Sequence, residues 1–300
     1  MNKALIIFIL AIVSTFTQYC FKVYGGEVTI VYSANTSGKL RECSCPGDPY
    51  GGLGERVTFI KMLRQNEDPF LLVDAGNIVG ITGKYELKCS AAMRIMNLMN
   101  YDVAAPGRLE MYNGIDNVLK MGEVAKFPII STSFVRKKSA ELIFKPYVIL
   151  TSNDQKVGVV TVSDSTCFLT TAQKQPEFDL LPLESSLKPT LDVLSKEADF
   201  IVVLSHMTSE GNKRLLEQYP QIDLVVQGYG NECFKTPVQT PNGILVAPGQ
   251  RGWFVGLITL MKTNRNSKPV IKKTSVIPVI DVPMDEDARK IIWDNYNDLK

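Results

Sequence analysis

Cys43 and Cys45 are separated by a single residue, and this Cys-x-Cys motif is the part of the sequence that most clearly suggests thiol or metal chemistry. One interpretation is a structural disulfide from either cysteine to another, which exported proteins form routinely. A second is thiol redox chemistry, since a disulfide between thiols this close is strained and easily reduced. A third is a soft-metal site for zinc or copper, with Cys233 and His206 as further ligands. No Cys-x-x-Cys-His motif is present, so we expect no covalently attached haem.

The segment FLLVDAGN (70–77) is a second place where chemistry is expected. Its apolar residues predict a buried strand, and ligands commonly bind just after the carboxyl ends of such strands. Asp74 supplies a carboxylate there. Asn77, in contrast, places an uncharged amide where a second carboxylate would be expected to hold a metal ion.

The whole chain contains one histidine, His206, which follows the apolar run 200–205. A site for two metal ions usually takes several imidazoles, because neutral imidazole fills positions that carboxylates would overload with charge. One histidine cannot build such a site. A lone histidine at a strand end is more often a hydrogen-bonded structural residue, and we expect that role for His206.

The N-terminal segment has the features of a secretory signal peptide. Lys3 is followed by the apolar run 4–16, which is too short to span a bilayer, and then by small residues at 25 and 26. We therefore expect residues 1–25 to be the signal peptide of a periplasmic or secreted protein; an uncleaved membrane anchor is the alternative. Without Lys3 and Lys22, basic and acidic residues are equal in number, which argues against nucleic acid as a partner.

Predicted strands and helices alternate along the rest of the chain. This pattern indicates an α/β fold in which helices cover both faces of the sheet structure. Strands are expected at 28–33, 70–73, 101–105, 128–132, 147–150, 156–162, 200–205, 222–226, 243–247 and 254–260. Helices are expected at 56–64, 90–99, 115–121, 187–196, 212–218 and 285–296.

The segments at the predicted strand ends resemble, in their order, the calcineurin-like metallophosphoesterases. The nearest branch is that of the secreted 5′-nucleotidases. The resemblance implies a four-layer α/β/β/α sandwich with two mixed sheets over residues 26–265, followed by an extension with one helix at 266–300. The segments that carry it are Tyr32–Gly38, Gly51–Arg56, Leu72–Asn77, Pro106–Glu110, Val203–His206, Gln227–Asn231 and Pro248–Gly256.

The sequence departs from this family at nearly every metal ligand. The family holds two metal ions bridged by a carboxylate, so that metal-bound hydroxide can attack phosphorus. The resemblance aligns the bridging aspartate with Asn77, and an Asn-His pair with Arg108 and Leu109. It aligns the last two imidazoles with Tyr229 and Asn231, so that only His206 matches among these ligands. The degenerate site then comprises Asn35, Thr36, Asp74, Asn77, Arg108, Leu109, His206, Tyr229 and Asn231.

These replacements predict that two-metal phosphoester hydrolysis is lost and that no metal of that type is bound. We expect a binding, accessory or assembly subunit of a periplasmic or envelope complex, with a protein as its partner. One alternative is a thiol-redox or soft-metal protein that uses Cys43 and Cys45 to bind zinc or copper. Another is a residual phosphoester hydrolase.

Overall fold

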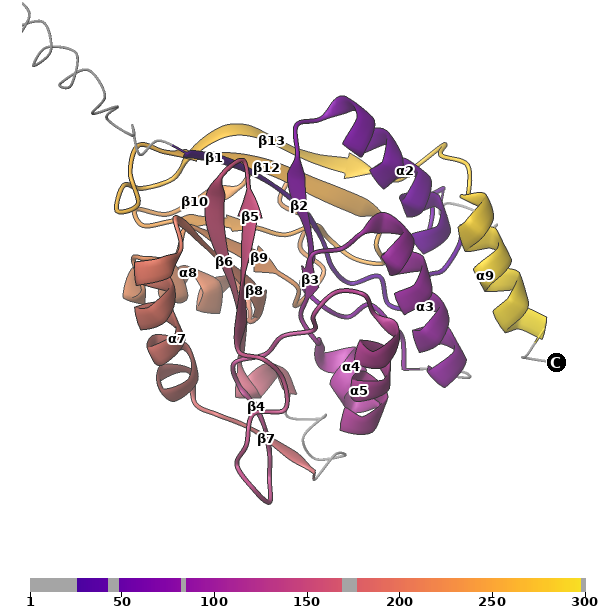
Figure 1. Ribbon diagram of the computed structural model, residues 1–300, viewed down its shortest axis with the longest axis horizontal. Coiled ribbons are helices and arrows are strands. Elements are labelled where there is room, and N and C mark those ends of the chain that lie inside the picture. Colours follow the sequence, from indigo (N-terminus) through magenta and orange to yellow (C-terminus); the bar gives the residue numbers. More distant parts are fainter. Residues whose placement is uncertain (1–25, 43–48, 82–84, 169–176, 298–300) are drawn as a thin grey trace, which may run out of the picture.

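Two mixed β-sheets packed face to face form the centre of the protein, and helices cover their outer faces (Figure 1). The computed structural model describes residues 26–42, 49–81, 85–168 and 177–297. The predicted signal segment 1–25 and the pair Cys43 and Cys45 therefore lie outside the described residues.

The first sheet has the strand order β13-β12-β1-β2-β3. Strands β1 (Gly26–Ser33), β2 (Phe70–Asp74) and β3 (Val103–Ala104) are parallel, and β12 (Phe254–Lys262) and β13 (Val270–Pro278) continue the sheet in the antiparallel sense. Strand β2 is buried along its whole length, as its continuous apolar sequence predicts for a sheet covered on both faces.

The second sheet has the strand order β10-β11-β9-β8-β6-β5, with parallel central strands and antiparallel edges. Asn153 and Asp154 connect β5 to β6 with left-handed φ angles of 49° and 60°, the geometry of a tight hairpin turn. The strands are β5 (Tyr147–Ser152), β6 (Gln155–Ser163), β8 (Phe200–His206), β9 (Leu224–Gln227), β10 (Val238–Gln239) and β11 (Ile244–Val246).

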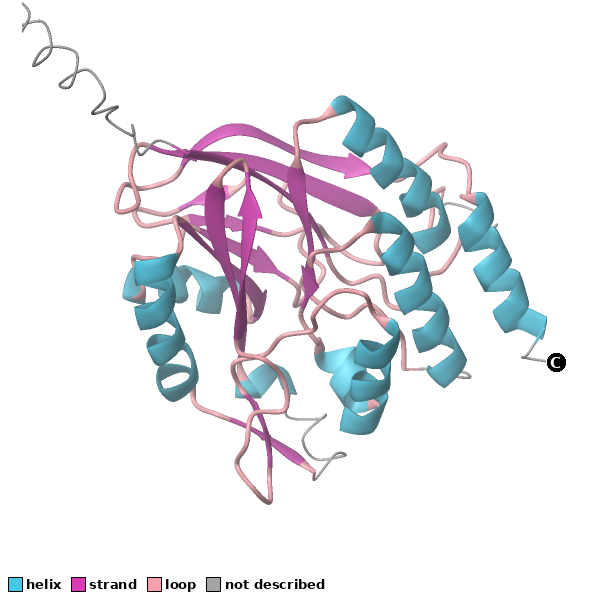
Figure 2. Cartoon of the chain, viewed as in Figure 1, coloured by secondary structure: helices cyan, strands magenta, loops and turns pink. Residues whose placement is uncertain are grey.

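Helices complete the outer layers (Figure 2). The first sheet is covered by α2 (Leu53–Asn66), α3 (Tyr85–Met99) and α9 (Glu286–Asn297), which share one apolar core cluster with it. The second sheet is covered by α7 (Leu183–Glu197) and α8 (Ser209–Gln218). A separate apolar cluster fills the space between the two sheets. The predicted four-layer fold with two mixed sheets is confirmed.

A small substructure stands at the carboxyl ends of the parallel strands. It consists of α4 (Arg108–Tyr112), α5 (Ile115–Val124) and a two-stranded sheet of β4 (Phe134–Arg136) and β7 (Phe178–Leu180). Three aromatic rings pack edge to face around Phe134 and hold these elements together. The short strands β4, β7 and β10 are not among the elements that the sequence pattern predicts.

One expected strand needs correction, and one observed strand is not among those expected. Residues 128–132 make isolated bridges rather than a regular strand. Strand β13 is absent from the predicted elements because Lys272 and Lys273 interrupt its apolar pattern, as charged residues commonly do in edge strands. Strand β13 lies in the first sheet and α9 in its helical layer, so described residues after position 265 contribute to the same core as the preceding residues.

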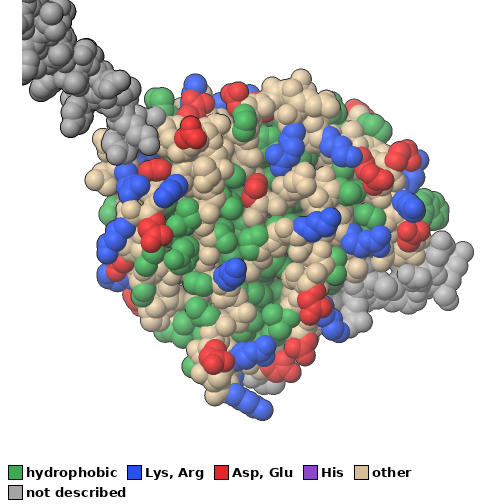
Figure 3. Space-filling model, in the orientation of Figure 1, with side chains coloured by type: hydrophobic (Ala, Val, Ile, Leu, Met, Phe, Trp, Pro, Cys, Tyr) green, Lys and Arg blue, Asp and Glu red, His purple; other side chains and the backbone are tan. Residues whose placement is uncertain are grey.

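The surface shown in Figure 3 carries positive and negative side chains interspersed, with no broad region of one sign. Within the described part of the chain, no helix has both the length and the apolar composition that crossing a membrane requires.

Candidate functional site

Loops that follow strands of both sheets meet at one edge of the sandwich, where the sequence predicts the site. The loop after β1 contacts the loop after β9, because Asn35 Nδ2 donates a hydrogen bond to the carbonyl of Gly230 at 3.1 Å. The loop after β2 reaches the same place, because Asn77 Nδ2 lies 3.4 Å from the carbonyl oxygen of Gly228. The fold therefore brings together positions far apart in the sequence.

Asn77 and Asn35 bind each other at the centre of this site. Asn77 Nδ2 donates to Asn35 Oδ1 at 2.9 Å, and Asn35 Nδ2 also donates to the carbonyl of Gly249 at 3.0 Å. Asn77 Oδ1 accepts a hydrogen bond from the backbone N–H of Leu109 at 3.0 Å. Both asparagines have left-handed backbones, with φ angles of 57° and 54°, which asparagine tolerates better than most residues. All polar side-chain atoms of the two amides thus hold loops together.

Glu110 is a buried carboxylate that binds backbone N–H groups from two loops. Its Oε2 accepts hydrogen bonds from Gly107 at 2.7 Å and from Asn77 at 2.9 Å, and its Oε1 accepts one from Val79 at 2.9 Å. Burial raises the pKa of Glu110 to about 7, and the three N–H donors oppose that shift. Sequence reasoning does not single out Glu110 as a site residue, although its position three residues after Gly107 is a helix-capping signal.

Asp74 is also buried, and both of its carboxylate oxygens have protein donors. Ser33 Oγ donates to Oδ2 at 2.6 Å, and the backbone N–H of Gly76 donates to Oδ1 at 2.8 Å. Burial raises the pKa of Asp74 to about 6, while Ser33 and the nearby Arg56 guanidinium lower it. Arg56 is fully buried and donates to the carbonyl of Gly252 at 2.9 Å, which ties α2 to the loop before β12.

His206, at the end of β8, is 2% exposed and packs between two aromatic rings. The ring centroids of Phe168 and Tyr229 lie 5.6 Å and 6.2 Å from that of His206. Neither imidazole nitrogen has a hydrogen-bond partner among the described residues. Burial lowers the pKa of His206 to about 3; the nearby backbone of Ala75 opposes this shift and the positive charge of Arg108 adds to it. The histidine is therefore neutral, with the backbone of Ala75 beside its ring, and its expected structural role stays a prediction.

The remaining positions of the degenerate site take different places. Arg108 is the first residue of α4 and is partly buried, and its charge acts on His206 and Tyr229. Thr36 is fully buried, and its hydroxyl has no hydrogen-bond partner in the described part of the protein. Asn231 is exposed. The first two thus lie within the protein beside the site, whereas Asn231 faces solvent.

The described cysteines do not assemble into one cluster. Cys89, Cys167 and Cys233 form no disulfide with one another. The backbone of Cys233 forms an isolated antiparallel β-bridge with Pro248, next to Gly249, whose carbonyl binds Asn35. Burial raises the pKa of the Cys233 thiol. Cys167, which sequence reasoning does not select, is buried beside Tyr229, and burial raises the pKa of this thiol too. Because Cys43 and Cys45 lie outside the described residues, their predicted roles stay predictions.

The residues at the strand ends do not fit a centre for two metal ions. Among the described residues, no group of three or more His, Cys, Asp and Glu side chains is placed to hold a metal ion. The oxygens of Asp74 and Glu110 accept hydrogen bonds from the protein, and Asn77 directs its amide at Asn35. Such a centre needs several oxygen or nitrogen ligands directed at shared metal positions. In this arrangement these groups are instead directed at hydrogen-bond partners within the protein.

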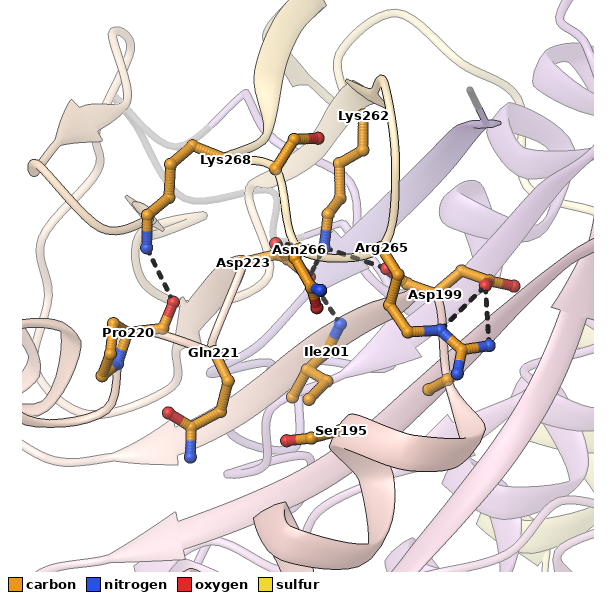
Figure 4. A pocket seen from close by; sticks show the side chains of 12 residues that line it. Ser195, Asp199, Ile201, Pro220, Gln221, Asp223, Lys262, Arg265, Asn266 and Lys268 are labelled. Atoms are coloured by element: carbon orange, nitrogen blue, oxygen red, sulfur yellow. Dashed lines mark hydrogen bonds and ion pairs between the residues drawn. The ribbon is translucent and has the colours of Figure 1, made fainter. Parts of the chain in front are cut away.

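A cavity of about 290 Å³ lies at the opposite end of the sheets, where Lys262 and Asp223 form a buried ion pair (Figure 4). Lys262 Nζ lies 2.9 Å from Asp223 Oδ1 and donates to the carbonyl of Asp199 at 3.0 Å. Arg265 donates to the Asp199 carboxylate at 3.1 Å, and Lys268 donates to a backbone carbonyl of the loop before β9 at 2.9 Å. Lys262, Arg265 and Lys268 thus each have a partner within the protein. We therefore interpret this group of ion pairs and hydrogen bonds as a structural connection between the two sheets.

Comparisons with known proteins agree with this fold. No family model matches the chain. Human 5′-nucleotidase is 27% identical over 225 residues, which are 70% of this chain and 39% of that protein. The chain thus spans about two fifths of the length of the curated relatives it matches.

Two solved structures superpose on nearly the whole chain. The 5′-nucleotidase precursor from Thermus thermophilus does so with a TM-score of 0.75 and 19% identity, covering 91% of this chain and 59% of that chain. The calcineurin-like phosphoesterase YfkN from Bacillus subtilis has a TM-score of 0.74 and 18% identity, covering 91% of this chain and 98% of that chain.

The fold and the relatives agree on the class: the protein has the fold of the calcineurin-like metallophosphoesterases, and its sequence is similar to those of 5′-nucleotidases. This similarity to 5′-nucleotidases agrees with the resemblance that the strand-end segments predict.

Proposed function

We propose that this protein is an exported 5′-nucleotidase-like protein that has lost two-metal phosphoester hydrolysis. In its place it acts as a binding, accessory or assembly subunit of a protein complex in the periplasm or cell envelope. The observation that carries this proposal is the hydrogen bond from Asn77 Nδ2 to Asn35 Oδ1 at 2.9 Å. A ligand that bridges two metal ions must direct lone pairs at both, whereas the Asn77 amide directs an N–H group at a neighbouring side chain.

Charge supports the same conclusion. An asparagine at the bridging position lacks the negative charge that balances two divalent cations. Arg108 adds a fixed positive charge beside His206, which further disfavours metal cations there. The remaining carboxylates, Asp74 and Glu110, are buried and already accept hydrogen bonds from the protein.

A binding role is consistent with the retained structure around the site. The two asparagines tie the loops after β1, β2 and β9 and the loop before β12 into one hydrogen-bonded unit. Loops held in this way lose little conformational freedom when a partner binds, and this lowers the cost of association. We therefore assign to these strand-end loops the role of a rigid surface for a protein partner.

Hydrolysis assays on the purified protein test the first half of this proposal. We expect no release of phosphate from nucleoside monophosphates in the presence of manganese, magnesium, zinc or iron. The matched variants are Asp74→Ala and His206→Ala, with Asn66→Ala on the exposed surface of α2 as the control. Hydrolysis by the wild type that both site variants abolish and the control retains would show that the enzyme is active.

Crosslinking inside the native host tests the second half. We expect the protein to be recovered in a crosslinked complex of defined composition. Substitution of the exposed Asn231, in the loop after β9, by a bulky charged residue should reduce the yield of that complex. Recovery of the protein only at its own mass would contradict the accessory-subunit role, independently of the result of the hydrolysis assays.

A further inference from the structure

The outer edge of α9 carries an apolar cavity that no part of the site described above uses. Its volume is about 360 Å³, and it is lined by Arg41, Met284, Arg289, Ile292 and Trp293. Trp293 is 58% exposed, more than any other large hydrophobic side chain in the described residues. An exposed indole beside a cavity is a feature of binding surfaces rather than of ordinary protein exterior.

The cavity is preformed because α9 is firmly attached to α2. Asp285 accepts a hydrogen bond from Lys61 Nζ at 2.6 Å and donates its backbone N–H to the carbonyl of Gly54 at 3.1 Å. The side chain of Asp285 also caps α9 by accepting from the backbone N–H of Ala288 at 3.3 Å. The inner face of α9 is buried in the same core cluster as α2 and α3. A partner would therefore meet a surface that needs little ordering.

Gly54 allows the floor of the cavity to form. A Cβ atom at this position would lie 2.9 Å from Met284 Cγ, so a larger residue would displace the Met284 side chain. Ile292 is 4% exposed and belongs to the core beneath, and Trp293 stands at the solvent side. The lining thus has a buried aliphatic side chain at its inner end and an exposed aromatic ring at its outer end, as in pockets that accept one anchoring side chain.

The charged residues that line the cavity are both arginines. Arg289 forms an ion pair with Glu286 at 3.6 Å, and the Glu286 side chain is 83% exposed. Exposed pairs of this kind contribute little to stability, so Arg289 can exchange Glu286 for a carboxylate of a partner at small cost. Arginine with tryptophan is also the composition enriched at the centres of protein interfaces. The electrostatic complement of this lining is acidic.

We propose that this cavity binds a segment of a protein partner in which an apolar or aromatic side chain is flanked by carboxylates. The apolar side chain lies against Met284, Ile292 and Trp293. A carboxylate of the segment pairs with Arg289 in place of Glu286. This inference rests on the proposed binding function and adds a second surface, apart from the strand-end loops, at which a protein partner binds.

Selection of short random peptides on the immobilised protein tests the inference directly. We expect the enriched peptides to combine aromatic or aliphatic residues with neighbouring Asp or Glu. Binding of the most enriched peptide, synthesised and titrated, should weaken by roughly tenfold or more in Trp293→Ala, because interface tryptophans commonly dominate affinity. Arg289→Glu should weaken binding of that peptide and restore it for a version with Lys in place of its acidic residues.

Met62→Ala is the matched control, because Met62 is 51% exposed on α2 but does not line the cavity. Its peptide affinity should equal that of the wild type. Enriched peptides without excess acid, or binding that survives Trp293→Ala, would overturn the inference. Sedimentation that shows a dimer lost in Trp293→Ala would also overturn it, because a second copy of the chain would then cover this face. None of these outcomes bears on hydrolysis, so the proposed function is judged separately.

Discussion

Asn77 donates a hydrogen bond from Nδ2 to Oδ1 of Asn35 across the two loops that follow β1 and β2, at 2.9 Å. The amide is used within the protein, and the same two side chains reach the loops from the second sheet. At the positions that the resemblance assigns to metal ligands, the chain thus has a hydrogen-bonded network that joins the two sheets.

Asn77→Asp tests the energetic role of this network. The carboxylate would lose the donor to Asn35 Oδ1 and face the carbonyl of Gly228, so we expect the free energy of unfolding to fall by about 1–3 kcal/mol. Asn66→Asp, an exposed change of the same chemistry, should alter it by less than about 0.5 kcal/mol. Urea unfolding measures both. Equal effects in the two variants would show that the Asn77 amide is not part of a stabilising network.

Glu110→Ala should destabilise the protein more than Glu55→Ala. Both glutamates are buried and cap a helix that starts after a glycine, but Glu110 accepts hydrogen bonds from three backbone N–H groups in two loops. Orphaned buried donors cost about 1–3 kcal/mol each, so we expect a loss of roughly 3 kcal/mol or more for Glu110→Ala. Comparison of the two denaturant midpoints checks the order, and a reversed order would contradict this assignment.

The pH dependence of stability should report the buried carboxylates. Burial raises the pKa of Glu110 from 4.5 to about 7, so its contribution to stability is complete below 4.5 and is lost as the pH rises through 7. Asp74, raised from 3.8 to about 6, acts in the same direction. His206, lowered from 6.5 to about 3, acts in the opposite one, since its contribution is lost as the pH falls below 6.5.

Glu110→Gln isolates the contribution of Glu110 to this pH dependence. Between about pH 6 and pH 8, the wild type should lose roughly 1 kcal/mol more stability than Glu110→Gln, because only the wild type ionises a carboxyl group at residue 110. Urea unfolding at the two pH values measures the difference. Parallel pH profiles for the two proteins would show that the carboxyl group of Glu110 titrates normally.

We expect the buried ion pair of Lys262 and Asp223, which joins the two sheets, to contribute strongly to stability. Lys262→Met leaves a buried carboxylate without its cation and should cost about 3–5 kcal/mol, whereas the double change Lys262→Met with Asp223→Leu should recover much of that loss. The exposed pair of Lys272 and Glu27 is the control, and Lys272→Met should change stability by less than about 1 kcal/mol. A double variant no more stable than the single one would contradict the ion-pair explanation.

Serine replacement of Cys43 and Cys45 separates the binding function from the thiol and soft-metal alternative. On the proposed function, the double variant keeps its partner complex and its metal content. Elemental analysis of protein purified without oxygen or chelator measures that content. Zinc or copper present in the wild type and lost in the double variant would favour the soft-metal function. About two manganese or iron ions per chain would instead support a residual hydrolase.

Much of the architecture follows from local patterns in the sequence. Continuous apolar runs such as 200–205 become buried parallel strands, and the amphipathic segment 285–296 becomes α9, because burial of apolar surface selects both. Strand β13 is not predicted from its sequence, because an edge strand is partly exposed and can carry charged side chains such as Lys272 and Lys273. Its place depends on pairing with β12 rather than on its own composition.

The sequence by itself determined the fold class, the strand ends at which the site lies and the shortage of imidazole, because residue type and periodicity carry that information. The tertiary structure alone decided that Asn77 binds Asn35, that Glu110 accepts hydrogen bonds from three N–H groups and that His206 is buried beside two aromatic rings. Such relationships depend on distances between loops from two sheets. Local sequence does not encode them, because they are set by how the whole sandwich packs.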